Sequence, residues 1–153
     1  MSSKRDAIAA AIVVALSAGG KPSGLNVHRF RARPITVDQL PAQLVYLVSE
    51  SVETGPGQAR GTEAKSVRSL TVRVETRIDA GSSTAPDAAI DQYLTWAVQT
   101  ILTDPTLGGV AVETVEESTQ WTAEELNKVY AAAQTDFVVK YITDAANPDA
   151  HTR

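Results

Sequence analysis

The chain contains no cysteine, which excludes disulfides, thiolate catalysis and zinc sites with cysteine ligands. Histidine is scarce: His28 has no partner at metal-ligand spacing, and His151 stands near the end of the chain. The glycine-rich signatures of nucleotide-binding loops and the motif of serine nucleophiles are also missing. We therefore expect no catalytic residues, no metal and no cofactor, so the chain is not expected to be an enzyme.

Long hydrophobic runs are missing as well. The longest, Ala7 to Leu16, is far shorter than the roughly 20 residues needed to cross a bilayer, so no membrane partner is expected. The overall net charge of −4 does not favour binding to nucleic acid. With 153 residues, 43% of them hydrophobic, the chain can build one core. We predict a single domain over residues 1–143 and a polar, disordered tail over residues 144–153.

The clearest pattern lies in Leu70–Ile78, within a strand predicted over Ser66–Asp79, where inward and outward residues alternate with a period of two. This alternation is typical of a half-buried β-strand. Before it, Ser49 to Lys65 is rich in glycine and charge and is expected to form a soft hairpin tip. Leu44 to Val48 is apolar at every position, which predicts an interior strand covered on both faces. Together these segments predict a protruding hairpin arm that contacts a partner.

Two helices are predicted. The first runs from about Ser3 to Ala18 and has an apolar stripe, although its N-terminal part also resembles a signal peptide. Asp6, which stands between the positive charges and the apolar run, favours the helix. The second helix has Thr84 as its N-cap and ends at Asp104, just before a proline.

Three further strands complete the predicted domain: Val27–Arg33, Val110–Gln120 with a bulge near Thr114, and Val129–Thr143. The segment between the last two, Trp121 to Lys128, is expected to be a short helical turn or a loop. The order helix, three strands, helix, two strands predicts an α+β domain. We expect a mainly antiparallel sheet of about five strands with both helices packed on one face.

Three arginines, Arg29, Arg31 and Arg33, alternate along the first predicted strand and would place their guanidinium groups on one face. Arg73 and Arg77 extend this basic stripe if their strand is close. The stripe faces phosphate under one interpretation. Under the others it pairs with acids across strands or contacts an acidic neighbouring subunit. The acids considered as cross-strand partners are Glu75, Glu113 and Glu116.

Trp96 lies off the best-defined apolar stripe of the second helix. It either anchors an interface or fills the flank of the sheet. An enzyme would need two carboxylates that converge on one point, and neighbours such as Glu116 and Glu117 point to opposite faces of a strand. That class predicts a pocket where acids from different elements meet.

The order of elements, together with several short motifs, resembles the tail terminator family of long-tailed bacteriophages, also called the minor tail protein U group, and related tail-completion proteins. The resemblance extends from about Ala7 to Ile142. The motifs that carry it are Phe30-Arg31-Ala32-Arg33-Pro34-Ile35, Leu40-Pro41, Leu44-Val45-Tyr46-Leu47-Val48-Ser49-Glu50 and Phe137-Val138-Val139-Lys140-Tyr141.

The resemblance implies a structural virion protein that forms a hexameric ring on the last ring of the tail tube. Such a ring ends tube polymerisation and offers a surface to the neck or head-completion protein, while DNA passes through it only as cargo. The implied location is the head-proximal end of the tail, with assembly in the host cytoplasm. A neck or tail-completion protein of similar fold, and a nucleic-acid-binding module that uses the arginine stripe, are the alternatives.

The resemblance also implies roles for particular residues. The hairpin tip would be the arm that contacts the next subunit or the tube, and the arginine stripe would line the channel or pair with a neighbour. The expected arm residues are Glu50, Glu53, Arg60, Glu63 and Lys65.

Overall fold

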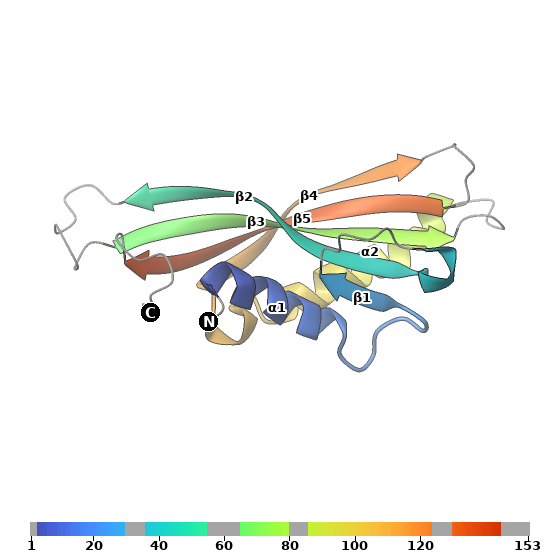
Figure 1. Cartoon of the computed structure of the whole chain (residues 1–153), viewed down its shortest axis with the longest axis horizontal. Helices are drawn as coiled ribbons and strands as arrows, with labels where there is room; N and C mark the ends of the chain where they lie inside the picture. Colours follow the sequence, from blue (N-terminus) through green and yellow to red (C-terminus); the bar gives the residue numbers. More distant parts are fainter. Residues whose placement is uncertain (1–2, 30–35, 55–64, 80–85, 124–129, 145–153) are drawn as a thin grey trace.

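The computed structural model describes residues 3–29, 36–54, 65–79, 86–123 and 130–144. These residues form one twisted five-stranded sheet with two helices on one of its faces (Figure 1). The elements are α1 (Lys4–Leu16), β1 (Asn26–Arg29), the 3₁₀ turn η1 (Val37–Gln39), β2 (Ala42–Thr54), β3 (Lys65–Asp79), α2 (Pro86–Thr103), the 3₁₀ turn η3 (Leu107–Gly109), β4 (Glu113–Ala123) and β5 (Tyr130–Asp144).

The strands lie side by side in the order β1-β2-β3-β5-β4. The pairs β2–β3, β3–β5 and β5–β4 are antiparallel, whereas β1 runs parallel to β2. The α+β class with five strands and two helices is therefore confirmed, and the sheet is mixed. A parallel pair needs a longer connection than a tight hairpin, and twelve residues, 30–41, separate β1 from β2 in the sequence.

Helix α1 confirms the first predicted helix. The Ser3 hydroxyl caps it by accepting a hydrogen bond from the backbone N–H of Asp6 at 3.1 Å. Ile8, Ile12 and Leu16 are fully buried against α2 and the sheet. The apolar run at the N-terminus is therefore part of the core.

Helix α2 presents one apolar stripe to the sheet. Ile90, Leu94, Ala97 and Ile101 on this stripe are buried. The helix ends before Asp104, whose carboxylate accepts hydrogen bonds from the backbone N–H groups of the following turn. The predicted N-cap, Thr84, lies outside the described residues.

Strand β3 forms the centre of the sheet and confirms the alternating pattern. Its side chains on the helix face are buried: Leu70, Val72, Val74, Thr76 and Ile78. On the neighbouring strand β5, Phe137, Val139 and Tyr141 are buried on the same face. Of the segment Leu44–Val48, predicted to be covered on both faces, only Leu44 and Val45 are buried, and Val48 is 43% exposed.

The expected soft tip is shorter than predicted. Strand β2 continues to Thr54 and β3 begins at Lys65, so Ser49 to Thr54 belongs to the sheet. Strand β5 pairs with the whole of β3, from Lys65 opposite Asp144 to Asp79 opposite Tyr130. The extension therefore has three strands where the sequence predicted a two-stranded hairpin, and Asp144 belongs to the domain rather than to the tail. Residues 145–153 lie outside the described part of the chain.

The edge strands also differ from the predicted bounds. Strand β4 begins at Glu113, three residues later than expected, because η3 and the turn after it occupy the preceding residues. Its bulge lies between Glu116 and Ser118. Trp121, expected in a turn or loop, belongs to β4. Strand β1 is described only as far as Arg29.

The packing of α1 can be tested with a matched pair of substitutions. We expect Ile12→Ala to reduce the free energy of unfolding by about 3 kcal/mol, because it leaves a cavity in the core. Val14→Ala on the same helix should change it by less than about 0.5 kcal/mol, since Val14 is 71% exposed. Chemical denaturation of both variants measures the difference, and equal effects would show that α1 does not pack as described.

Candidate functional site

The most prominent feature of the molecule is an extension of the sheet past the N-terminal end of α1 (Figure 1). We call it the arm and define it as residues 50–54 of β2, 65–69 of β3 and 140–144 of β5, which pair with one another. Both α1 and α2 lie beside the other part of the sheet, as Figure 1 shows. Most of the arm therefore lies beyond the main helix-packed core, which Tyr141 at the base of the arm joins.

A cluster of charged and polar side chains holds the base of the arm. The carboxylate of Glu50 accepts hydrogen bonds from Arg5 Nε at 3.0 Å and Nη2 at 2.8 Å, and from Arg68 Nη1 at 2.8 Å. The Tyr141 hydroxyl donates a further hydrogen bond to Glu50. We call these four residues the Glu50 cluster. Its members come from four elements: α1, β2, β3 and β5.

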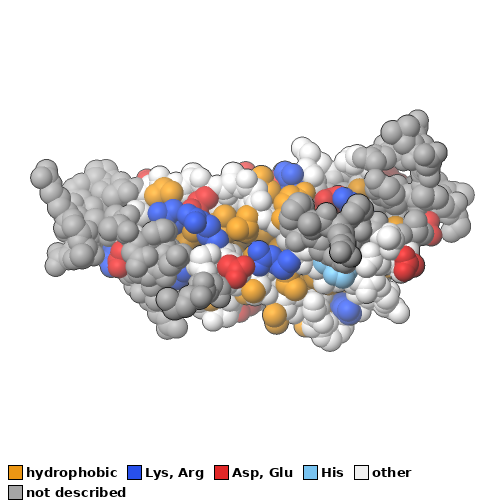
Figure 2. Space-filling view, in the orientation of Figure 1, with side chains coloured by type: hydrophobic (Ala, Val, Ile, Leu, Met, Phe, Trp, Pro, Cys, Tyr) orange, Lys and Arg blue, Asp and Glu red, His pale blue; other side chains and the backbone are white. Residues whose placement is uncertain are grey.

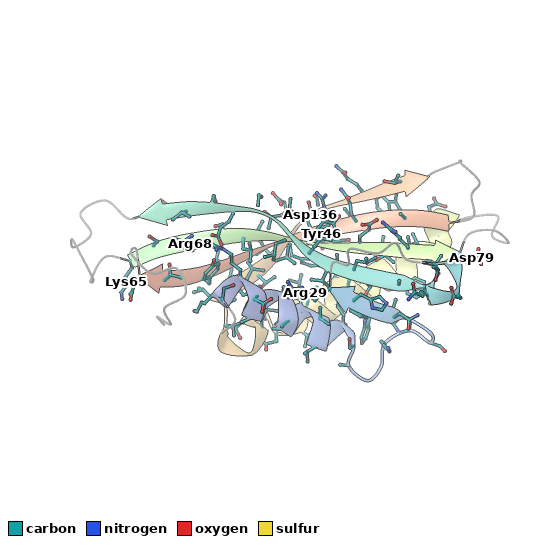
Figure 3. The ribbon with its side chains drawn as sticks, viewed as in Figure 1. Arg29, Tyr46, Lys65, Arg68, Asp79 and Asp136 are labelled. Atoms are coloured by element: carbon teal, nitrogen blue, oxygen red, sulfur yellow. The ribbon has the colours of Figure 1, made fainter. Side chains whose placement is uncertain are left out.

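Strand register explains why these residues meet. Arg68 is opposite Tyr141, and Glu50 is opposite Leu70, so all of these side chains lie on the helix face. Arg5 reaches them from the first turn of α1. Arg68 Nε also donates to the Thr143 hydroxyl at 3.1 Å. Figure 3 shows Arg68 near the arm end of the sheet.

The electrostatics of the cluster favour a charged carboxylate and a neutral phenol. Burial opposes the charge of Glu50, but the hydrogen bonds from Arg5, Tyr141 and Arg68 outweigh it and lower the pKa of Glu50. Burial and the hydrogen bond to Glu50 raise the pKa of Tyr141 to about 12. The hydrogen bond to Glu50 raises the pKa of Arg5. At neutral pH Tyr141 is therefore protonated and donates its hydrogen bond, while Glu50 is ionised and accepts.

This anchoring gives Glu50 a role within its own chain, whereas the contact role expected of it stays a prediction. Its side chain is only 12% exposed and is used by three donors of the same chain. The accessible positions lie further along the arm. Glu53 is exposed, Val52 is 51% exposed and Val67 is 39% exposed. Lys65 forms an ion pair with Asp144, which joins β3 to β5. The other expected arm residues, Arg60 and Glu63, lie outside the described residues.

The face of the sheet without helices carries a second polar network. Arg73 donates to both carboxylate oxygens of Asp136, at 2.8 and 3.0 Å, and this pairing raises the pKa of Arg73. Its guanidinium also lies 5.9 Å from the ring of Tyr46. Arg77 pairs with Glu75 at 2.9 Å. Figure 3 shows Tyr46 and Asp136 near the middle of the sheet.

The suggested extension of the basic stripe from Arg29 to Arg73 and Arg77 is wrong. Arg29 is opposite Val45, which places it on the helix face, and it pairs with Asp6 of α1 at 3.0 Å. Arg73 and Arg77 belong to the other face, so they do not extend a surface that contains Arg29. On the face seen in Figure 2, basic side chains are interspersed with acidic and apolar ones. Arg31 and Arg33 lie outside the described residues.

The two tryptophans have different environments. Trp96 is half-buried, and its indole N–H donates to the carbonyl of Leu16 at 3.2 Å, so it joins α2 to the end of α1. Trp96 therefore has a role inside the domain, and its place at an interface stays a prediction. Trp121 was missed by the sequence analysis and is 56% exposed on β4. The alternation that continues through Thr119 and Trp121 could have placed it in a strand.

The described residues contain no group of three or more histidine, aspartate or glutamate side chains arranged to hold a metal ion. No helix among them is long and apolar enough to cross a membrane.

The Glu50 cluster generates a prediction about pH. Because the folded-state pKa of Glu50 is lowered, its stabilisation is present above the ordinary pKa of 4.5 and is lost as the pH falls through the folded-state value. At pH 7 we expect Glu50→Gln to cost about 2 kcal/mol of unfolding free energy, and the cost should shrink towards about pH 3. Denaturation at several pH values measures this.

The matched control is Glu53→Gln, which makes the same change in the same strand at an exposed position. It should alter stability by less than about 0.5 kcal/mol at any pH. Equal effects of the two substitutions would contradict the anchoring role of Glu50.

The chain was compared with known proteins at the level of sequence. No protein-family model matches it, and no curated protein matches it.

Proposed function

We propose that this chain is a structural virion protein that caps the tail tube of a long-tailed phage as a ring. In this role it ends tube polymerisation and provides the surface to which the head-side neck proteins join. The observation that carries the proposal is the three-stranded arm, whose base is anchored to α1 by the Glu50 cluster. An arm with a fixed direction and exposed apolar side chains is suited to contact a neighbouring protein.

The arm supports assembly because its exposed apolar side chains lie on both faces. Val52 is opposite Arg68 and shares the helix face with it, whereas Val67 is opposite Glu53 on the other face. The two valines are 51% and 39% exposed. A contact that buries both faces would enclose the arm between two surfaces, as happens where one subunit overlaps the next in a ring.

The proposed ring has defined partners. The ring is a homo-oligomer, a hexamer by its likeness to the terminator family, and its other partners are the tail tube protein and the neck protein. DNA passes through it without sequence-specific contacts. The protein works at the head-proximal end of the tail after assembly in the host cytoplasm. A neck or tail-completion protein of similar fold would differ in which of these partners it binds.

The test combines mass measurement with tube capping. Purified protein, alone and mixed with the tube protein of the same phage, is examined by native mass measurement and negative-stain imaging. We expect hexameric rings at one end of tubes whose growth has stopped. Val52→Asp should abolish capping, because it places a charge in the arm contact, while the far-UV circular dichroism of the variant stays unchanged.

The control for this experiment is Val14→Asp, which changes another exposed valine at a site on α1, outside the arm. It should leave capping intact. Protein that neither forms rings nor joins tubes would overturn the proposed function, and DNA binding that weakens steeply with salt would favour the nucleic-acid-binding alternative.

A further inference from the structure

A groove runs between α2 and β4 on the helix face of the sheet. One part has a volume of about 420 Å³ and an adjoining part about 540 Å³, and both are lined by Asp91 and Trp121. Leu94 and Val98 contribute apolar wall, and Glu116 lies on the β4 side. The groove therefore combines an apolar wall, an exposed indole and acidic side chains from two elements.

The charge of this region has a single sign. Neither α2 nor β4 contains a lysine or an arginine. Their acidic residues are Asp87, Asp91, Glu113, Glu116 and Glu117. All five are exposed, so the elements that form the groove attract a cationic ligand.

Strand β4 is also an edge of the sheet, since it pairs with β5 alone among the described strands. An edge strand directs alternate backbone N–H and C=O groups outward, where an extended segment can add to it. Residues at positions i and i+2 of the added segment point to the same face. A segment with two arginines at this spacing would place both side chains on the groove side.

The chain itself contains such a segment. Residues 30–35 read Phe-Arg-Ala-Arg-Pro-Ile, with Arg31 and Arg33 at the required spacing. They follow β1, the edge strand on the opposite side of the sheet from β4. No acidic residue occurs between Asn26 and Val37. Within one copy, β1 and β4 are separated by the other three strands of the sheet.

We propose that the groove between α2 and β4 binds the segment around Arg31 and Arg33 of a second copy of this chain. The guanidinium groups pair with Asp91 and Glu116, and one of them stacks on the ring of Trp121. Because β1, which precedes this segment in the chain, and β4 lie at opposite edges of the sheet, the contact is head-to-tail and can close into a ring. The inference deepens the proposed ring and rests on it for this closure.

The test uses a peptide, so that it does not depend on ring formation. A peptide of residues 26–36 is titrated into the full-length protein, and tryptophan emission is recorded. We expect saturable binding with a change in emission that is absent in Trp121→Phe. Asp91→Lys should weaken binding at least about tenfold, because it places like charges together. Glu113→Lys is the control: it makes the same charge reversal in β4, at a residue that does not line the groove.

A second peptide carries glutamate in place of both Arg31 and Arg33. It should not bind the unmodified protein but should bind the Asp91→Lys, Glu116→Lys double variant, since the charges are then exchanged. Absence of peptide binding, or equal weakening by Asp91→Lys and Glu113→Lys, would overturn the inference. Rings that assemble normally from the Asp91→Lys variant would overturn it too and leave the proposed function standing.

Discussion

The structure depends on one ionised carboxylate that four elements share. The main apolar core of the sheet ends close to Leu70 and Tyr141, and beyond these residues the arm has little helix packing to fix its direction. Glu50 supplies the connection, because it accepts hydrogen bonds from α1, β3 and β5 while it belongs to β2. A half-buried charge is costly unless it is paired, so the cluster favours the single arrangement in which all of its donors are in place.

The same strands build two surfaces of different chemistry. On the helix face, alternate residues of β3 and β5 bury apolar side chains under α1 and α2. On the other face, Arg73 and Asp136 form a bidentate ion pair that joins β3 to β5, with Tyr46 of β2 beside it. Cross-strand pairs of this kind give a polar sheet face its register. The sheet is therefore held together by contacts on both of its faces.

The elements that the sequence predicted well are those whose signal is local. The alternation in Leu70–Ile78 and the stripe of Ile90, Leu94 and Ile101 follow from the periods of strand and helix alone. The strand over Ser49–Thr54 was missed because its residues are mostly polar and it gains its order from pairing with β3. The Glu50 cluster could not be predicted, since Glu50 and Tyr141 are 91 residues apart and meet only through strand register.

The charges at the two edges of the sheet limit how two copies of the chain can pair. An exposed β4 edge would template pairing with another β4, but such a pair brings Glu113, Glu116 and Glu117 of two copies together. Like charges oppose that symmetric contact, and they favour a partner edge without acidic residues. The β1 side of the sheet offers this, since the stretch from Asn26 to Val37 carries only positive charge. The charge pattern thus disfavours two-fold pairing, and it is compatible with the head-to-tail contact proposed above.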